Sequence, residues 1–465
     1  MNEEKREEKS NLSRRAFVKG AAAIGAGISL AGILSGSKAR AAAAPPAKGK
    51  STLQFAAPKM DKVRIGIVGL GARGSGAMDR LSQIEGVEIT ALCDVRPKCV
   101  QGAQKTLARM NKPKALEFGK DENDWKNLAS SKEVDLVYTP TPWHLHTPIC
   151  VFAMEQGKHA ATEVPAAISL DECWQLVDTA EKTQRHCMML ENCCYGENEL
   201  LALNLCRLGI LGDLVHGEAA YIHDLRGYKF ASEQEGGYQG LWRLKHSMVH
   251  TGNPYPTHGL GPVSQYMGIN RGDRFDYMAS LSSAQLGLTA FAVGKFGADS
   301  PEAKQTYKLG DMNTTVIRTI KGRTIMVQHN TTSPRPYSRL NLISGTKGIL
   351  ADYPLRVAID SDSWMSDKDL EAFRVKYRHP MWKQVGEVAM KVGGHGGMDF
   401  VMDWRLIYCL RNGEPLDQSV YDAAAWSSIG PLSEVSVANR GKSVDIPDFT
   451  RGIWEKVPPL PVIGA

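Results

Sequence analysis

The stretch Val63-Arg64-Ile65-Gly66-Ile67-Val68, followed directly by Gly69-Leu70-Gly71-Ala72-Arg73-Gly74, decides the fold of the first half of the chain. Its first six residues form a short β-branched run typical of a buried strand, and a helical pattern occupies residues 75–84. A G-x-G-x-x-G segment between a strand and a helix is the fingerprint of a dinucleotide-binding domain. A second strand over residues 87–92 leads to Asp94, where such domains carry their acidic residue.

The glycine spacing meets the physical demands of a bound dinucleotide. Gly69 permits the tight turn, Gly71 lets the backbone approach the pyrophosphate, and Gly74 lets the helix pack on the strand. The helix N-terminus then faces the phosphates. Asp94 can accept hydrogen bonds from both ribose hydroxyls, while its charge disfavours a 2′-phosphate. We therefore expect NAD, rather than NADP, as the cofactor.

Strands and helices alternate up to about residue 190. Strands are expected at residues 135–139, 159–162 and 188–190, with helices at residues 148–156 and 170–183. This βαβ alternation predicts a parallel sheet, in which ligands bind at the carboxyl ends of the strands. The predicted cofactor-binding residues are Gly69, Gly71, Ala72, Arg73, Gly74, Asp94, Trp143, His144, Leu145, His146, Glu163, Val164 and Asn192.

The second half is richer in strands, which are expected at residues 215–222, 274–281, 314–320, 324–329 and 339–344. Several such strands in sequence predict a largely antiparallel sheet. The predicted fold class is therefore α/β. It combines an N-terminal Rossmann dinucleotide-binding domain over residues 62–195 with a C-terminal α+β domain over residues 196–465, whose largely antiparallel sheet is open.

Two polar loops in the second half are candidate sites. The first, Asn253-Pro254-Tyr255-Pro256-Thr257-His258-Gly259, is braced by prolines, which restrict the backbone and suit a preorganised site. The second, Gly393-Gly394-His395-Gly396-Gly397, precedes a helical segment over residues 398–410, and His395 could equally stabilise a turn. Further polar candidates, each of which fits a surface or core place when taken singly, are Tyr195, Tyr221, Arg243 and Tyr337.

The N-terminus has the pattern of an export signal. Ser13-Arg14-Arg15-Ala16-Phe17-Val18-Lys19 precedes an uncharged apolar run over residues 21–34, and small residues follow up to Ala44. The paired arginines indicate a twin-arginine signal over residues 1–44, with an uncleaved anchor as the alternative. Residues 45–61 are expected to form a flexible linker. These features predict a periplasmic or other extracytoplasmic protein whose mature form has no stable membrane span.

Composition excludes several classes of protein. The chain has 465 residues, 43% of them apolar and 23% charged, which is typical of a globular protein and excludes a disordered or collagen-like chain. Most of the net charge of +6 lies in residues 1–44, and no basic stripe follows, so we expect no nucleic-acid partner. The nine cysteines include no C-x-x-C pair, and we expect neither a disulfide framework nor a metal site.

The motifs, taken together, resemble a known family. The glycine-rich opening, Thr139-Pro140 with His144, and Glu163-Val164-Pro165 are similar to the glucose–fructose oxidoreductase / inositol dehydrogenase superfamily. The combination of Trp143-His144-Leu145-His146, Glu191-Asn192, Tyr255-Pro256-Thr257-His258-Gly259 and Gly394-His395-Gly396-Gly397-Met398-Asp399 resembles glycoside hydrolase family 109. Members of that family are NAD-dependent α-N-acetylgalactosaminidases, and the resemblance covers residues 62 to the C-terminus.

The resemblance implies redox-neutral hydrolysis. Oxidation at C3 of the sugar acidifies the C2 proton, the C1 group is eliminated, water adds, and reduction at C3 restores the cofactor. It gives His258 the C3 hydroxyl proton, Tyr195 the C2 proton and Tyr255 a further catalytic role. The implied substrate-binding residues are Tyr221, Arg243, Tyr255, Pro256, Thr257, His258 and Tyr337.

One departure from the superfamily bears on this expectation. The usual Glu-Lys-Pro element reads Glu163-Val164-Pro165, and a valine cannot transfer the proton that the lysine handles in the dehydrogenases. An exported NAD-dependent sugar or cyclitol dehydrogenase stays open as an alternative, as does a non-catalytic protein that keeps NAD as a structural part. The expected partner is a small glycoside or a glycan terminus, and an open sheet face favours a homo-oligomer by analogy of fold.

Overall fold

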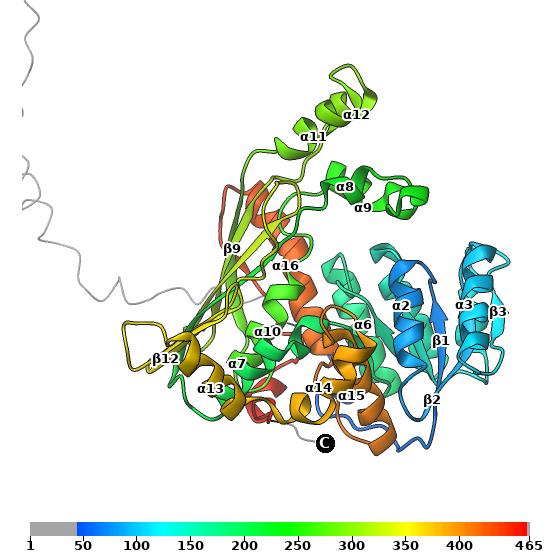
Figure 1. Ribbon diagram of the computed structural model, residues 1–465, viewed down its shortest axis with the longest axis horizontal. Helices are drawn as coiled ribbons and strands as arrows, with labels where there is room; N and C mark the ends of the chain where they lie inside the picture. Colours follow the sequence, from blue (N-terminus) through cyan, green and yellow to red (C-terminus); the bar gives the residue numbers. More distant parts are fainter. Residues whose placement is uncertain (1–43, 463–465) are drawn as a thin grey trace, which may run out of the picture. The chain divides into compact units, whose positions relative to one another are not determined.

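The computed structural model describes residues 44–462, and the predicted twin-arginine signal, apart from Ala44, lies outside this range. The first half forms a six-stranded sheet in the order β3-β2-β1-β4-β5-β6, with every neighbouring pair parallel (Figure 1). Its strands are β1 (Val63–Val68), β2 (Val87–Cys93), β3 (Leu116–Phe118), β4 (Leu136–Thr139), β5 (His159–Thr162) and β6 (Cys187–Met189). The predicted Rossmann sheet is confirmed.

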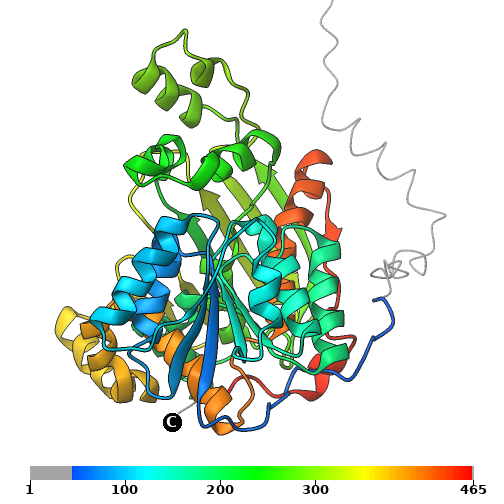
Figure 2. The same ribbon diagram turned by 90° about the vertical axis from the view of Figure 1, so that its right-hand side faces the viewer.

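Helices cover both faces of this sheet, as its hydrophobic strands require. Those that connect its strands are α2 (Ala72–Leu81), α3 (Pro97–Arg109), α4 (Trp125–Ser130), α5 (His146–Glu155) and α6 (Leu170–Thr183). Two helices from the end of the chain also pack here: α15 (Met398–Asn412) contacts α2 and β1, and α16 (Val420–Ala438) contacts α6 and β6 (Figure 2). The C-terminal part of the chain therefore completes the core of the first domain.

The second half contains an eight-stranded sheet in the order β13-β12-β11-β7-β10-β9-β8-β14. Only β7 and β10 pair in parallel among these described strands, so the sheet is largely antiparallel as expected. Its strands are β7 (Leu214–Ile222), β8 (Phe275–Ser282), β9 (Asn313–Thr319), β10 (Thr324–Asn330), β11 (Leu342–Gly345), β12 (Gly348–Ala351), β13 (Arg356–Ile359) and β14 (Val444–Asp445).

One face of this sheet is covered and the other is open. Helix α10 (Thr257–Met267) packs on β7 and α16 packs on β8, which places both helices between the two sheets (Figure 1). Along β9 the burial alternates, with Ile317 fully buried and Val316 48% exposed on the opposite face. The other helices of this half are α7 (Glu197–Arg207), α8 (Arg226–Phe230), α9 (Trp242–Val249), α11 (Gly287–Phe296), α12 (Pro301–Lys304), α13 (Asp367–Tyr377) and α14 (Pro380–Val392).

The segment 45–61 differs from the expectation of a flexible linker. Leu53 and Ala57 are buried, the Thr52 backbone N–H donates to the hydroxyl of Tyr421, and Met60 N donates to a carbonyl of α15. The segment is therefore fastened along the body of the protein. No helix within residues 44–462 is long and apolar enough to cross a membrane.

Candidate active site

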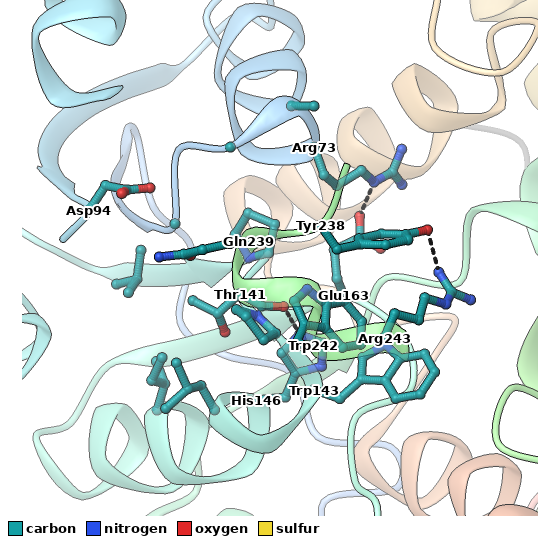
Figure 3. A pocket seen from close by; sticks show the side chains of 18 of the residues that line it. Arg73, Asp94, Thr141, Trp143, His146, Glu163, Tyr238, Gln239, Trp242 and Arg243 are labelled. Carbon is teal, nitrogen blue, oxygen red and sulfur yellow. Dashed lines mark hydrogen bonds and ion pairs between the residues drawn. The ribbon is translucent and has the colours of Figure 1, made fainter. Parts of the chain in front are cut away.

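A cleft of about 460 Å³ opens at the carboxyl ends of β1, β2, β4 and β5 and is closed from the other side by the second half of the chain (Figure 3). This volume is typical of small-molecule and cofactor sites. The predicted site residues that line the cleft are Gly69, Gly71, Ala72, Arg73, Asp94, Trp143, Leu145, His146, Glu163, Val164, Asn192, Tyr221, Arg243, Tyr255 and His258. His395 lines it as well.

The glycine-rich turn has the shape that a pyrophosphate needs. Gly69 has a φ of +97°, which only glycine adopts without strain, and a Cβ on Gly74 would lie 1.9 Å from the Gly69 carbonyl oxygen. Gly74 does not reach the cleft, and it acts by letting α2 approach the turn. A Cβ on Gly71 would meet only the Arg96 guanidinium, at 3.4 Å, so the backbone of Gly71 is open to a ligand. The N-terminus of α2 points into this space, so the residues fit a dinucleotide.

Asp94 ends β2 as predicted, but its carboxylate already has partners. It accepts hydrogen bonds from the backbone N–H groups of Leu70 and Arg96 and from the Arg96 guanidinium, at 2.7–3.1 Å. Burial raises the pKa of Asp94, but these hydrogen bonds outweigh it and lower the pKa overall. For Asp94 to bind the ribose hydroxyls as predicted, the Arg96 guanidinium must therefore move away from its carboxylate.

The residues of the loop after β4 have different roles, because some hold the loop in shape and others line the cleft. Both ring nitrogens of His146 lie 2.7 Å from backbone carbonyl oxygens, of Pro165 and Thr141, so this histidine holds the loop in shape. His144 is exposed to solvent and does not line the cleft. Trp143 is buried and stacks on Tyr255 with 5.6 Å between ring centroids. Of the two histidines expected in the cofactor wall, only His146 reaches it.

An ion network links the glycine-rich turn to α15. Arg73 Nε lies 2.5 Å from Glu163 Oε1, and Arg73 Nη1 lies 2.7 Å from Asp399 Oδ2. Asp399 also accepts hydrogen bonds from the amide of Asn192 and from His395 Nδ1. Burial raises the pKa of Asp399, but the hydrogen bond from His395 and the charge of Arg73 lower it well below its ordinary range. The network fixes Glu163 and Asn192 at the inner end of the cleft.

Arg243, at the start of α9, is enclosed by aromatic rings. Its guanidinium carbon lies 4.9–6.0 Å from the centroids of five rings, namely Trp143, Tyr221, Tyr238, Trp242 and Tyr255. Its Nη1 donates to the Tyr238 hydroxyl, whereas the buried Nη2 has no hydrogen-bond partner among the described residues (Figure 3). A buried donor without a partner costs free energy, so a ligand acceptor at this point would be favoured.

His258 and Glu191 form a buried pair beside the cleft. The Nδ1 atom of His258, in the first turn of α10, lies 2.8 Å from Oε1 of Glu191, which follows β6. Its Nε2 lies 3.4 Å from the Tyr255 hydroxyl. Burial raises the pKa of Glu191, but attraction to His258 outweighs it, and the pKa is lowered overall. When His258 is neutral and donates its Nδ1–H to Glu191, it presents Nε2 toward the cleft as a proton acceptor.

The loop before α10 is tied down, which fixes this geometry. The Asn253 backbone N–H donates to Ser433 of α16 at 2.7 Å, and the Asn253 side chain accepts from Tyr255 N. Pro256 and Thr257 are buried in the loop and do not line the cleft. They lie behind the lining of the cleft, and their contact with substrate stays a prediction.

Tyr221 is another proton-carrying group of the cleft. It stands near the end of β7, and its hydroxyl lies 2.9 Å from Nδ1 of His223. Tyr337 stands beside this pair, with 5.1 Å between its ring and that of His223, but it is outside the lining of the cleft. A ligand would have to extend beyond the cleft to reach it.

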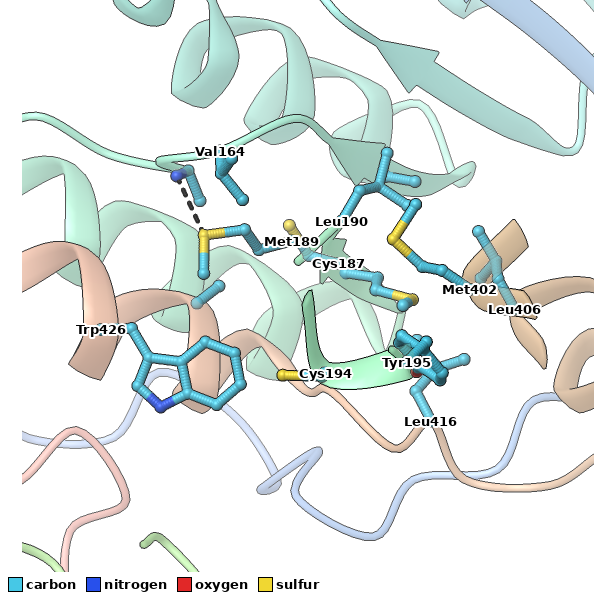
Figure 4. Close-up of a cluster of buried hydrophobic side chains, with 14 of the residues drawn as sticks. Val164, Cys187, Met189, Leu190, Cys194, Tyr195, Met402, Leu406, Leu416 and Trp426 are labelled. Carbon is cyan, nitrogen blue, oxygen red and sulfur yellow. Dashed lines mark hydrogen bonds between the residues drawn. The ribbon is translucent and has the colours of Figure 1, made fainter. Parts of the chain in front are cut away.

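Tyr195 lies apart from the cleft, contrary to expectation. It ends the short helix η3 (Asn192–Tyr195), is 2% exposed, and its hydroxyl faces Asp417 Oδ2 at 3.5 Å. Figure 4 shows it inside a cluster of apolar side chains, next to Leu416. Burial raises the pKa of Tyr195 well above the ordinary value and raises that of Tyr221 to about 12, so it is position that separates the two tyrosines. This position does not fit the predicted transfer of a substrate proton.

Several residues in or beside the cleft were not predicted as site residues from the sequence. Glu191 and Asp399 were noted only as parts of motifs, and neither was given a role. The segment containing Gly236, Gly237, Tyr238 and Gln239 reaches across the cleft from the second domain (Figure 3), and no periodic pattern marks it. A signal was present for Glu191, because a carboxylate at the end of a parallel strand faces the ligand side of the sheet.

Two family models match the chain, and together they span the cleft. Residues 63–191 match "Oxidoreductase family, NAD-binding Rossmann fold", and residues 195–456 match "Glycosyl hydrolase 109, C-terminal domain". The chain belongs to glycosyl hydrolase family 109. It is an NAD-dependent glycoside hydrolase, and NAD is the cofactor that the first domain binds.

Relatives within family 109 match over the whole length. A glycosyl hydrolase family 109 protein of Shewanella sp. (strain W3-18-1) is 49% identical over 461 residues, which cover 98% of this chain and 100% of the relative. A Shewanella oneidensis protein named alpha-N-acetylgalactosaminidase is 48% identical with the same coverage.

Solved structures of lower identity share the fold of this family 109 protein. Levoglucosan dehydrogenase, in complex with NADH and levoglucosan, aligns with a TM-score of 0.63 at 18% identity, covering 83% of this chain and 100% of that one. Scyllo-inositol dehydrogenase from Lactobacillus casei aligns with a TM-score of 0.58 at 13% identity, covering 83% and 99%.

Proposed function

We propose that the protein releases terminal α-linked N-acetylgalactosamine from glycosides or glycans by a redox-neutral mechanism. The observation that carries the proposal is the Glu191–His258 pair, which places a proton acceptor in a cleft shared with the NAD site. The name of the Shewanella oneidensis relative supports the choice of sugar. When bound, NAD⁺ supplies the capacity to take a hydride from a sugar carbon and to return it.

His258 takes the proton of the sugar hydroxyl at the carbon that is oxidised. Glu191 accepts from Nδ1, so Nε2, which faces the Tyr255 hydroxyl at 3.4 Å, carries the lone pair that general-base catalysis requires. Val164 lines the cleft where dehydrogenases of this superfamily carry lysine, and an aliphatic side chain moves no proton. This leaves His258 as the base for that hydroxyl.

Tyr221 replaces Tyr195 in the second proton transfer. A proton must leave C2 before the C1 group is eliminated, and the group that removes it has to reach the sugar. Tyr221 lines the cleft, and its hydrogen bond to His223 orients the phenolic hydroxyl. Arg243 supports the sugar with its unpartnered Nη2, and the rings around it supply apolar surface to the sugar ring.

The substrate assignment is tested on purified protein without added cofactor. The protein is mixed with p-nitrophenyl α-N-acetylgalactosaminide while nitrophenol and NADH are followed together. We expect catalytic release of nitrophenol with no net NADH. NADH that accumulates only with free sugars and added NAD⁺, without nitrophenol release, would instead indicate a sugar or cyclitol dehydrogenase.

Export by the twin-arginine route is the second part of the proposal. Arg14-Arg15 and the apolar run after them support it, and a cofactor that is never consumed can be loaded before folded export. The test is cell fractionation of the full chain and of an Arg14→Lys/Arg15→Lys variant. We expect the first outside the cytoplasm and the second retained within it, and equal distribution would argue against this route.

A further inference from the structure

The donor set beside the catalytic histidine is suited to a metal ion. Glu191, Cys193 and His258 each offer one ligand atom, and these atoms lie within 4.8 Å of one another. Imidazole nitrogen, thiolate sulfur and carboxylate oxygen are the three donors that Zn²⁺ takes in proteins. Tetrahedral zinc with such ligands holds its donors about 3.3–3.8 Å apart. The widest pair of donor atoms therefore has to approach by about 1 Å, whereas His258 Nδ1 and Glu191 Oε1, which lie 2.8 Å apart, have to separate by about 0.5 Å.

Part of this donor set is unsatisfied without a metal. Glu191 is 0% exposed, and its Oε2 makes no hydrogen bond of normal length to any residue in the described range, with the Thr257 hydroxyl as its neighbour. Its Oε1 contacts His258 and Cys193 N. The Cys193 thiol has a long contact, 3.5 Å, with the Asn192 side-chain oxygen and faces Glu191. A buried carboxylate oxygen without a partner is costly, and a cation would relieve that cost.

A small ion can reach this point from the cleft. His258 lines the cleft and its side chain is 15% exposed, whereas Glu191 and Cys193 lie behind it. His258 is therefore the entrance to the cluster, and its ring stands between the ion and the substrate space.

We propose that Glu191, Cys193 and His258 form an inhibitory Zn²⁺ site that switches off the proposed hydrolysis. The metal takes the Cys193 thiolate, a Glu191 oxygen and Nδ1 of His258, with water as a fourth ligand. The thiol proton is released to solvent, and the imidazole proton moves from Nδ1 to Nε2. The reaction is an exchange of protons for a metal ion, and no redox step occurs.

The inhibition follows from the tautomer of His258. Without the metal, Nδ1 carries the proton that it donates to Glu191, and Nε2 is free to accept one from the sugar. With zinc on Nδ1, a neutral imidazole carries its proton on Nε2 and can no longer act as a base. The same Glu191 side chain that directs His258 toward catalysis then becomes a ligand that holds it in the inactive form.

The test compares two adjacent cysteines. Cys194 is buried in the apolar cluster of Figure 4 and is outside the donor set, so Cys194→Ser is the matched control for Cys193→Ser. All variants are made in a Cys99→Ser/Cys206→Ser background, because these two thiols are partly exposed and could bind zinc unspecifically. NAD-loaded protein is assayed on the nitrophenyl glycoside with increasing ZnCl₂, and then with EDTA.

We expect zinc to inhibit the background protein and its Cys194→Ser variant, with recovery in EDTA. Cys193→Ser should need at least about tenfold more zinc for the same inhibition, because it loses the thiolate ligand. Equal zinc sensitivity of the two cysteine variants would overturn the proposal, as would full activity of the background protein in about 1 mM zinc, far above a typical site affinity.

A second readout does not depend on activity. Co²⁺ in place of Zn²⁺ gives a thiolate-to-metal absorption band when sulfur is a ligand, so the band should form in the background protein and in Cys194→Ser but not in Cys193→Ser. If Cys193→Ser does not fold, Cys193→Ala takes its place, and its cobalt spectrum is compared with that of the background protein. Metal binding does not depend on the proposed function, and only the inhibitory effect rests on it. A cobalt band without glycoside hydrolysis refutes the hydrolase alone. Hydrolysis without the band refutes the metal site alone.

Discussion

Nδ1 of His258 lies 2.8 Å from Oε1 of Glu191, a contact that joins the first turn of α10 to the carboxyl end of β6. It ties the second domain to the NAD-binding sheet at the place where a sugar hydroxyl would meet its base. Glu191 is fully buried and is fixed in turn by the backbone N–H of Cys193. In the proposed mechanism, Glu191 is thus a positioning residue, which acts on the substrate through His258.

Replacing Glu191 by Gln should slow turnover and change its pH dependence. We expect kcat/KM to fall about 10- to 100-fold, since a misdirected base loses part of the usual effect of general-base catalysis. The amide cannot stabilise an imidazolium as the carboxylate does, so the acidic limb of the kcat/KM profile should change.

The control for this variant is Glu181→Gln. Glu181 is also buried and paired, with Tyr421 and Arg451, but it does not line the cleft. It should cost stability without moving the acidic limb. An unchanged profile in Glu191→Gln would show that Glu191 has only a structural role.

Removing the hydroxyl of Tyr195 and that of Tyr221 should affect turnover to very different extents. Tyr195→Phe removes a hydroxyl with one contact at 3.5 Å in an apolar cluster, so kcat/KM should stay within about threefold of the native value. Tyr221→Phe removes the hydroxyl bonded to His223 in the cleft and should lower kcat by at least about 100-fold. Steady-state kinetics on the nitrophenyl glycoside measure both effects. A large loss of activity in Tyr195→Phe and a small one in Tyr221→Phe would restore Tyr195 as the base.

Cofactor choice should depend on Asp94. Asp94→Asn removes the charge that opposes a 2′-phosphate and weakens the hold on the Arg96 guanidinium, which can then meet a phosphate. We expect the ratio of Kd for NADPH to Kd for NADH to fall at least about tenfold, a change of about 1.4 kcal/mol. Fluorescence titration of cofactor-free protein measures it. Asp135→Asn, which breaks a similar pair with Arg64 outside the cleft, should leave the ratio unchanged.

Lys229 should make stability depend on pH. It is buried, donates to Ser247 and Thr331, and has no carboxylate within ion-pair distance among the described residues. Burial lowers its pKa to about 7. The unfolded chain then binds the proton more tightly than the folded one between about pH 7 and pH 10.4, so the free energy of unfolding rises with pH across that window.

The variant Lys229→Met removes this titration. In the native protein, Lys229 makes the free energy of unfolding rise by up to about 1.4 kcal/mol per pH unit above pH 7. The variant lacks this contribution, so its melting temperature should rise less between pH 6 and pH 9. Calorimetry of both proteins over this range measures the difference. Parallel pH dependences would mean that Lys229 keeps its proton in the folded protein.

The local parts of the fold could be predicted from sequence, and the contacts between distant segments could not. Strand β1 and helix α6 match their expected bounds, because the residue patterns that specify them lie within each segment. Strands β12 and β13 have four residues each, too few for a pattern to emerge. Helix α15 packing on α2 depends on pairing across more than 300 positions, which one sequence does not reveal.

The candidate site divides in the same way. Residues at strand ends, such as Glu163 and Asn192, were placed correctly because topology alone brings strand ends together. Tyr195 was misplaced because one turn of η3 carries it from the cleft into the core. Asp399 was given no role because its partners, Arg73 and Asn192, lie more than 200 residues earlier in the chain.

The most direct test of the redox-neutral mechanism is to run the hydrolysis in D₂O and examine the released N-acetylgalactosamine by NMR. Removal of the C2 proton before the C1 bond breaks requires a solvent proton to return to C2, so we predict one deuterium at C2 in every product molecule and none at C3. Product that keeps its original hydrogen at C2 would contradict the mechanism and would indicate direct hydrolysis at C1.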